Sequence, residues 1–174
     1  MNKFIDRSTA IIPVVSKAAT IFELLQELEV VLIKKRIPLC RQVNGKFYHP
    51  DVLTWFPDVK NQTTTMSPKM QLCTLPAGGM IEREIISEAK EIEMNYRHMI
   101  VDCIKAVIAL VQDNHFTSMG MYNIAFLIET YKGKSTQIRF GLRSDDGTFY
   151  LSVRKGKGSR KCNAGCKLLL SKSI

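Results

Sequence analysis

Hydrophobic residues recur at intervals of three and four over residues 81–113, the longest periodic stretch in the chain. The apolar positions are Ile85, Ala89, Ile92, Tyr96, Met99, Cys103, Val107 and Leu110. Such intervals place side chains along one face of an α-helix, and neither glycine nor proline interrupts the stretch. The pattern predicts one long central helix over 81–113, with residues 99–111 buried on nearly every side.

A second helical pattern covers residues 19–35. Its apolar positions are Ile21, Leu24, Leu25, Leu28, Val31 and Leu32. Thr20 is a suitable N-cap, basic residues follow at the C-terminal end, and Pro38 prevents continuation. The dipeptide Asn44-Gly45 then predicts a small hairpin over 40–49, and Pro50 predicts the start of a short helical piece over 52–56.

The C-terminal part alternates between apolar and polar residues with a period of two. Strands are predicted over 122–131, 137–143 and 148–155, joined by loops rich in Gly, Ser, Lys and Asp. Phe149, Leu151 and Val153 then share the face that covers the helix. The period places Arg139, Arg143, Tyr150, Ser152 and Arg154 on the opposite, solvent-facing side.

These elements predict an α+β fold, in which a helical N-terminal part and a long central helix pack against a C-terminal three-stranded antiparallel meander. We divide the chain into four regions. They are a helical N-terminal unit with a small hairpin (1–59), a long loop or linker (60–79), the central helix plus the meander (80–155), and a basic, glycine-containing tail (156–174).

Charge is distributed unevenly along the chain. The net charge is +9. Residues 132–174 hold eleven Lys and Arg against two Asp, which is also +9, and the first 131 residues hold fourteen of each sign. The whole excess therefore lies in the last quarter of the chain, which favours a polyanionic partner.

The sequence thus predicts a non-enzymatic protein, regulatory or architectural, that binds DNA or RNA through the basic sheet face and tail. Cationic side chains neutralise phosphates, and a tyrosine on the same face can stack on a base. The candidate contact residues are Arg139, Arg143, Tyr150, Arg154, Lys155, Lys157, Arg160 and Lys161.

Two other interactions are compatible with the same sequence. The basic residues could dock on an acidic protein surface, as an interaction module or inhibitor. The central helix could mediate self-association if an apolar stripe stays exposed on it.

Enzymatic readings have little support. Gly133-Lys134-Ser135 resembles the end of a phosphate-binding loop, but Ile128 occupies the position of the first glycine. His98 and Asp102 are four residues apart and could pair on the predicted helix, although no nucleophile is marked out beside them. We assign no catalytic residue and no cofactor.

The five cysteines, Cys40, Cys73, Cys103, Cys162 and Cys166, do not have the density of a disulfide framework. Cys162 and Cys166 have a spacing that suits two zinc ligands or a redox pair, but the remaining ligands of a zinc site are missing nearby, so no metal is assigned. Asp6, Pro13 and Lys17 interrupt the first seventeen residues, and no apolar run is long enough to span a membrane. We therefore expect no signal peptide, no membrane association and a cytoplasmic location.

Overall fold

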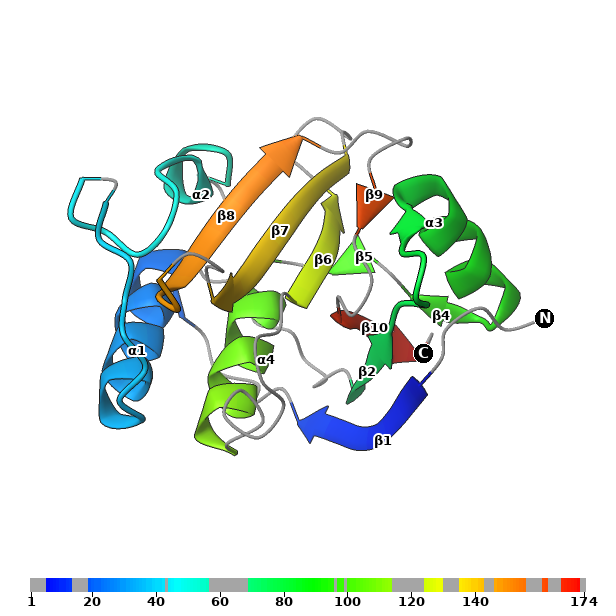
Figure 1. Cartoon of the computed structure of the whole chain (residues 1–174), viewed down its shortest axis with the longest axis horizontal. Coiled ribbons are helices and arrows are strands. Elements are labelled where there is room, and N and C mark those ends of the chain that lie inside the picture. Colours follow the sequence, from blue (N-terminus) through cyan, green and yellow to red (C-terminus); the bar gives the residue numbers. More distant parts are fainter. Residues whose placement is uncertain are drawn as a thin grey trace.

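The computed structural model describes residues 6–13, 19–42, 44–56, 69–95, 97–98, 100–113, 124–129, 135–142, 146–155, 161–162 and 167–172. Helices and strands are mixed along this part of the chain, which agrees with the α+β prediction (Figure 1). The helices in it are α1 (Ile21–Lys34), α2 (Asp51–Thr54), α3 (Glu82–Glu91) and α4 (Ile100–Gln112).

Helix α1 confirms the prediction made for residues 19–35. Thr20 is its N-cap: its Oγ1 accepts a hydrogen bond from the Glu23 backbone N–H at 3.1 Å. In return, the Glu23 carboxylate accepts one from the Thr20 N–H at 2.8 Å. This reciprocal pair satisfies two backbone donors that the first turn leaves without partners. The short helix predicted after Pro50 is α2.

The predicted long helix over 81–113 is wrong, because the segment forms two helices with a break between them. Helix α3 ends at Glu91, and Glu93 has a φ of 56°, the left-handed conformation that commonly ends a helix. The next residues form β4 (Met94–Asn95) and β5 (Arg97–His98), which pair with other strands. Strand pairing therefore overrides the helical periodicity at this point.

The larger sheet is also more extensive than the predicted meander. Within the described residues its spatial order is β1 (Asp6–Pro13), β2 (Lys69–Thr74), β10 (Lys167–Lys172), β6 (Ile124–Glu129), β7 (Ser135–Leu142) and β8 (Phe149–Lys155). Strands β6, β7 and β8 pair antiparallel. The parallel pairing of β10 with β6 continues the sheet into β2 and β1, so these three strands are one part of a larger sheet.

Strands β6 and β10 pair only at their beginnings, where Lys167 and Leu168 lie opposite Ile124 and Ala125. Further along, β10 pairs with β4, and β6 pairs with β5. The segment that separates α3 from α4 thus supplies strand partners to both. A second, two-stranded sheet joins β3 (Met80–Ile81) to β9 (Lys161–Cys162) beside the start of α3.

The two hydrophobic clusters lie on opposite faces of the sheet. Leu151 pairs with Phe140, Phe140 with Ile124, and Ile124 with Lys167. These four positions therefore share one face of the sheet. Residues of α1 and α4 form a cluster with Phe149, Leu151 and Val153 on that face. Leu168 and Leu170 face the other way and pack with Ile85 and Ala89 of α3. Helices therefore cover different ends of the sheet on different sides (Figure 1).

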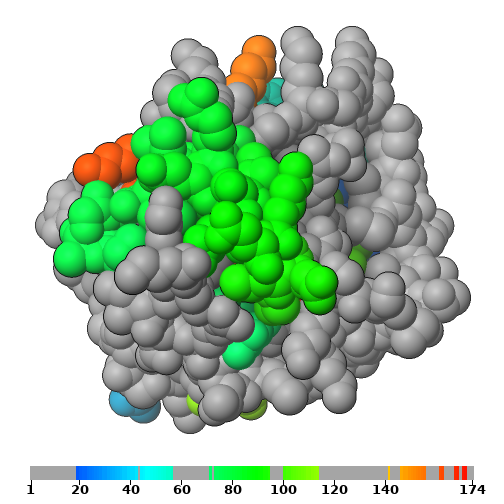
Figure 2. Space-filling model, turned by 90° about the vertical axis from the view of Figure 1, so that its right-hand side faces the viewer, coloured from blue at the N-terminus to red at the C-terminus, as the bar shows by residue number. Residues whose placement is uncertain are grey.

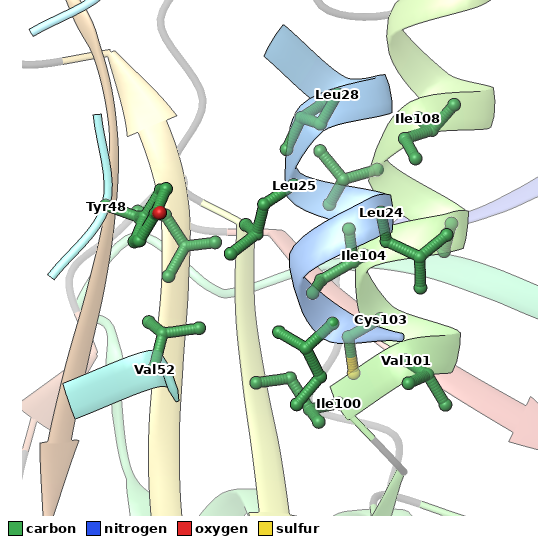
Figure 3. Packing of buried hydrophobic residues seen from close by; sticks show 14 of the residues in the cluster. Leu24, Leu25, Leu28, Tyr48, Val52, Ile100, Val101, Cys103, Ile104 and Ile108 are labelled. Carbon is green, nitrogen blue, oxygen red and sulfur yellow. The ribbon is translucent and has the colours of Figure 1, made fainter. Parts of the chain in front are cut away.

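Packing between α1 and α4 forms the larger of these clusters. Figure 3 shows Leu24 and Leu28 of α1 beside Ile104 and Ile108 of α4, whereas Leu25 points from α1 towards Tyr48 and the strands. Eleven of the thirteen residues of α4 are buried. The self-association predicted for 81–113 required an exposed apolar stripe, and the apolar side chains of α4 lie almost entirely inside the fold.

Strands occur in two regions of the chain for which the sequence predicted none. Strand β2 lies inside the predicted loop 60–79, of which residues 60–68 are outside the described residues. Strands β9 and β10 lie inside the predicted tail 156–174, and β10 is an interior strand between β2 and β6. Because Leu168 and Leu170 are buried, this part of the tail belongs to the core.

The predicted hairpin over 40–49 includes Val43, which lies outside the described residues. Asn44 and Gly45 have φ values of 51° and 68°, as an Asn-Gly turn requires. Leu39 before the turn and Tyr48 after it both pair with β8, Leu39 with Phe149 and Tyr48 with Leu151. The Asn44-Gly45 turn forms. The backbone of β8 makes hydrogen bonds with the segment before this turn and with the segment after it.

Lys105 is a buried lysine on the mostly apolar helix α4. Its side chain is 8% exposed, and its Nζ is one of the buried polar atoms without a hydrogen-bond partner in the described part of the chain. Removing the amine while keeping the unbranched stem should relieve the cost of burying it. We expect Lys105→Met to raise the free energy of unfolding by about 1 kcal/mol, measured by urea denaturation.

Lys105→Ala is the matched control, because it removes the amine and the stem together and leaves a cavity. It should be less stable than Lys105→Met. If Lys105→Met is instead less stable than the parent protein, the amine makes an interaction that outweighs its burial.

Candidate nucleic-acid interface

Strand β8 presents one apolar and one polar face. Phe149, Leu151 and Val153 are buried, whereas Tyr150 and Ser152 are half-buried and Arg154 is exposed. This confirms the alternation predicted for residues 148–155. The apolar side is held by the cluster that contains α1 and α4, so the polar side faces away from those helices.

Pairing with β7 places Arg139 on the same face. Arg139 lies directly opposite Ser152, and the pairs on either side of it are Gly141 with Tyr150 and Gln137 with Arg154. Side chains of paired residues project to the same side of a sheet, with Cβ atoms about 5 Å apart for direct pairs and about 7–8 Å for diagonal ones. Arg139 and Arg154 are therefore diagonal neighbours, with Tyr150 on the other diagonal.

The register also identifies a residue that sequence reasoning missed. Gln137 lies directly opposite Arg154 in the pairing of β7 with β8. Alternation along β7 could have placed Gln137 on the polar side. Its position beside Arg154 depends on the cross-strand register, which one strand pattern does not reveal.

The start of β8 is fixed by a local turn. The Asp146 carboxylate accepts hydrogen bonds from the Thr148 backbone N–H at 3.0 Å and from the Thr148 hydroxyl at 2.6 Å. Asp146 and Gly147 lie in the loop predicted between the last two strands, and Gly147 has a positive φ of 68°. This turn places Phe149 and Tyr150 at the beginning of the strand.

Two further predicted contact residues lie at the edges of this face. Lys155 is exposed at the last position of β8, opposite Thr136, so the period of two turns it away from Arg154. Lys161 is exposed in β9, opposite Ile81. Six residue steps separate Lys155 from Lys161, which limits the distance between their Cα atoms to about 20 Å.

The remaining predicted contact residues, Arg143, Lys157 and Arg160, lie outside the described residues. The pairing of β7 with β8 thus brings Arg139, Tyr150 and Arg154 to one face, whereas Lys155 is the last residue of β8 and Lys161 lies in β9.

Helix α3 borders this region with a different charge. Its ten residues include Glu82, Glu84, Glu88 and Glu91 against Arg83 and Lys90. Figure 2 shows α3 (green) across one side of the molecule, with β9 (orange-red) beside it and the end of β8 (orange) projecting at the top. Strands β7, β8 and β9 hold four basic residues and no acidic one, whereas α3 is net acidic.

The pair predicted from His98 and Asp102 does not lie on one helix. His98 belongs to β5 and pairs with Ile128, whereas Asp102 lies in the first turn of α4. Because α4 begins at Ile100, His98 and Asp102 do not lie one turn apart on the same helix.

The cysteines that the structure describes, Cys40, Cys73, Cys103 and Cys162, are buried and are not in disulfide bonds. Burial raises the pKa of Cys103 well above its ordinary value, and the nearby negative charge of Asp102 raises it further. A thiol with a raised pKa stays protonated near neutral pH and is a poor nucleophile. In the described residues, no three His, Cys, Asp or Glu side chains are grouped so that they could hold a metal ion. Cys166 lies outside them.

Tyr48 lies on the core side of β8 and has a raised pKa, first because of burial and second because of the charge of Glu29. Tyr48 and Tyr150 lie on opposite sides of β8, so Tyr48 is not part of the candidate interface.

Comparisons with protein-family models, with curated proteins and with solved structures found no match to this chain. No helix in the described part of the chain is long and apolar enough to cross a membrane.

Proposed function

We propose that this protein binds nucleic acid, DNA or RNA, without catalysing a reaction on it, and acts as a regulatory or architectural protein. The proposed surface is the polar face of β7 and β8 with the exposed basic residues at its edge. Arg143, Lys157 and Arg160 are proposed to extend this surface.

One observation carries the proposal. The register makes Arg139 and Arg154 diagonal neighbours on a face that also holds Tyr150, while the reverse side of β8 is buried against helices. Two guanidinium groups on adjacent strands can contact neighbouring phosphates, each through several N–H donors. A rigid sheet holds them at a fixed spacing, which lowers the entropy lost on binding.

Tyr150 adds a contact of a different kind. Gly141, directly opposite it, contributes no side chain to the face. An aromatic ring on a sheet surface can stack on an unpaired base, in addition to the phosphate contacts of neighbouring basic residues. This combination favours a single strand or an unpaired region over a regular duplex.

The alternative, docking on an acidic protein surface, uses the same cations. Both kinds of partner bind more weakly at high salt, but only a nucleic acid offers bases for stacking. Competition by an unrelated oligonucleotide separates the two, because it displaces a nucleic acid and leaves a shape-specific protein partner bound.

The first test neutralises the two arginines of the sheet face. Arg139→Gln/Arg154→Gln should weaken binding of a fluorescent single-stranded oligonucleotide and make the slope of log affinity against log salt shallower. The expected change is about 1.4 units for a single strand, or about 1.8 for a duplex, because two phosphate contacts are removed. The free energy of unfolding should change by roughly 0.5 kcal/mol or less per site.

Lys46→Gln/Lys90→Gln is the matched control, since it removes the same charge from two exposed lysines outside β7, β8 and β9. Its salt slope should stay close to that of the parent protein. Equal slopes for both double variants would mean that binding depends on net charge alone, and the sheet face would lose its assigned role.

The second test concerns Tyr150. Tyr150→Ala should weaken single-strand binding by about 1–3 kcal/mol, as other stacking residues do, whereas Tyr150→Phe keeps the ring and should bind as the parent protein does. Binding is measured by fluorescence anisotropy and folding by circular dichroism. If Tyr150→Ala binds as tightly as Tyr150→Phe, the ring makes no stacking contact.

A further inference from the structure

The outer face of α1 exposes a row of large apolar side chains. Phe22, Val30 and Ile33 are 48%, 52% and 57% exposed, respectively. With Gln26 they follow steps of four, four and three residues, which places all four on one stripe of the helix. Three large apolar residues on a single exposed stripe form a patch rather than scattered surface positions.

The rest of α1 is anchored in the core, so the helix is held with this stripe outward. Leu24, Leu25, Leu28 and Leu32 are at most 2% exposed on the opposite side. The Thr20–Glu23 capping box fixes the first turn, and Arg41 forms an ion pair with Glu29 on the flank. The stripe is therefore a rigid surface that needs little reordering to bind a partner.

Charge along α1 is polarised from one end to the other. Glu23, Glu27 and Glu29 lie in the first two-thirds of the helix, and Lys34, Lys35 and Arg36 lie at its end. A second α1 aligned antiparallel sets the acidic part of each helix against the basic end of the other. A parallel alignment would set like charges side by side.

We propose that a second copy of this chain covers the stripe, forming a two-fold symmetric dimer through antiparallel α1 helices. Two-fold symmetry makes the contacts reciprocal. An axis near the middle of the helix places Phe22 against Ile33 of the other copy, and Val30 against Gln26. Glu23 then lies beside Lys34 of the other copy on the same flank, and symmetry repeats this pair.

Dimerisation leaves the polar face of β7 and β8 open in both copies. Helix α1 packs on the side of the sheet that holds Phe149, Leu151 and Val153, which is the reverse of the side that holds Arg154. The inference does not depend on the proposed function. If both hold, one dimer presents two basic faces, and a strand long enough to reach both binds with increased avidity.

Sedimentation equilibrium of the full chain, without nucleic acid, tests the dimer. We expect a concentration-dependent dimer for the parent protein and a dissociation constant about a hundredfold weaker or more for Val30→Glu/Ile33→Glu, which places four carboxylates in the seam. Leu53→Glu is the control, because Leu53 is also an exposed apolar residue (38%) but lies on α2. It should dimerise like the parent protein.

Lys34→Glu provides a second variant that leaves the apolar stripe intact. It should weaken the dimer because each introduced carboxylate lies beside Glu23 of the other copy. Circular dichroism checks that every variant is folded. A parent protein that stays monomeric up to about 1 mM, the range of weak association, would overturn the proposal. So would a dimer that Val30→Glu/Ile33→Glu and Lys34→Glu leave unchanged.

Discussion

Burial of α4 against α1 and the sheet is the interaction on which the rest of the structure depends. Helix α4 contributes Ile104, Val107 and Leu110 to the larger cluster, each at most 1% exposed. Complete burial of such side chains contributes about 1.5–3 kcal/mol each. Because this packing occupies one side of β8, it determines which side of β7 and β8 stays open. The position of the candidate interface thus follows from where the helices bind the sheet.

The sheet also ties together distant parts of the chain. Strand β10, close to the C-terminus, lies between β2 and β6 and packs Leu168 and Leu170 against residues of α3. Lys167 at its start is nine-tenths buried and donates a hydrogen bond from Nζ to the Thr74 hydroxyl at 2.5 Å. Not every basic residue in the last quarter of the chain is therefore available to a partner. Lys167 belongs to the interior, whereas Arg154, Lys155 and Lys161 are exposed.

Sequence reasoning succeeded where local physics decides the structure. Thr20 directly precedes the apolar helical pattern, so its role as N-cap could be predicted from the sequence, and the alternation of β8 follows from the pleat of a strand. It failed for features that depend on the pairing of strands far apart in the sequence. Neither glycine nor proline marks the break at Glu93, which depends on β4 and β5 finding partners in β10 and β6. Leu168 and Leu170 lie between Lys167 and Lys172, and the neighbouring sequence does not reveal that their strand pairs with β2. For the same reason, Gln137 could not be placed beside Arg154.

The central claim is that nucleic acid contacts the side of β7 and β8 that faces away from α1 and α4. Covalent labelling of arginine and lysine side chains, read by mass spectrometry with and without a bound single-stranded oligonucleotide, tests it most directly. We predict that bound oligonucleotide slows labelling of Arg139 and Arg154, and leaves Lys46 and Lys90 unchanged. Labelling of Arg154 at the same rate in the free and bound protein, under conditions where the oligonucleotide is fully bound, would contradict the account.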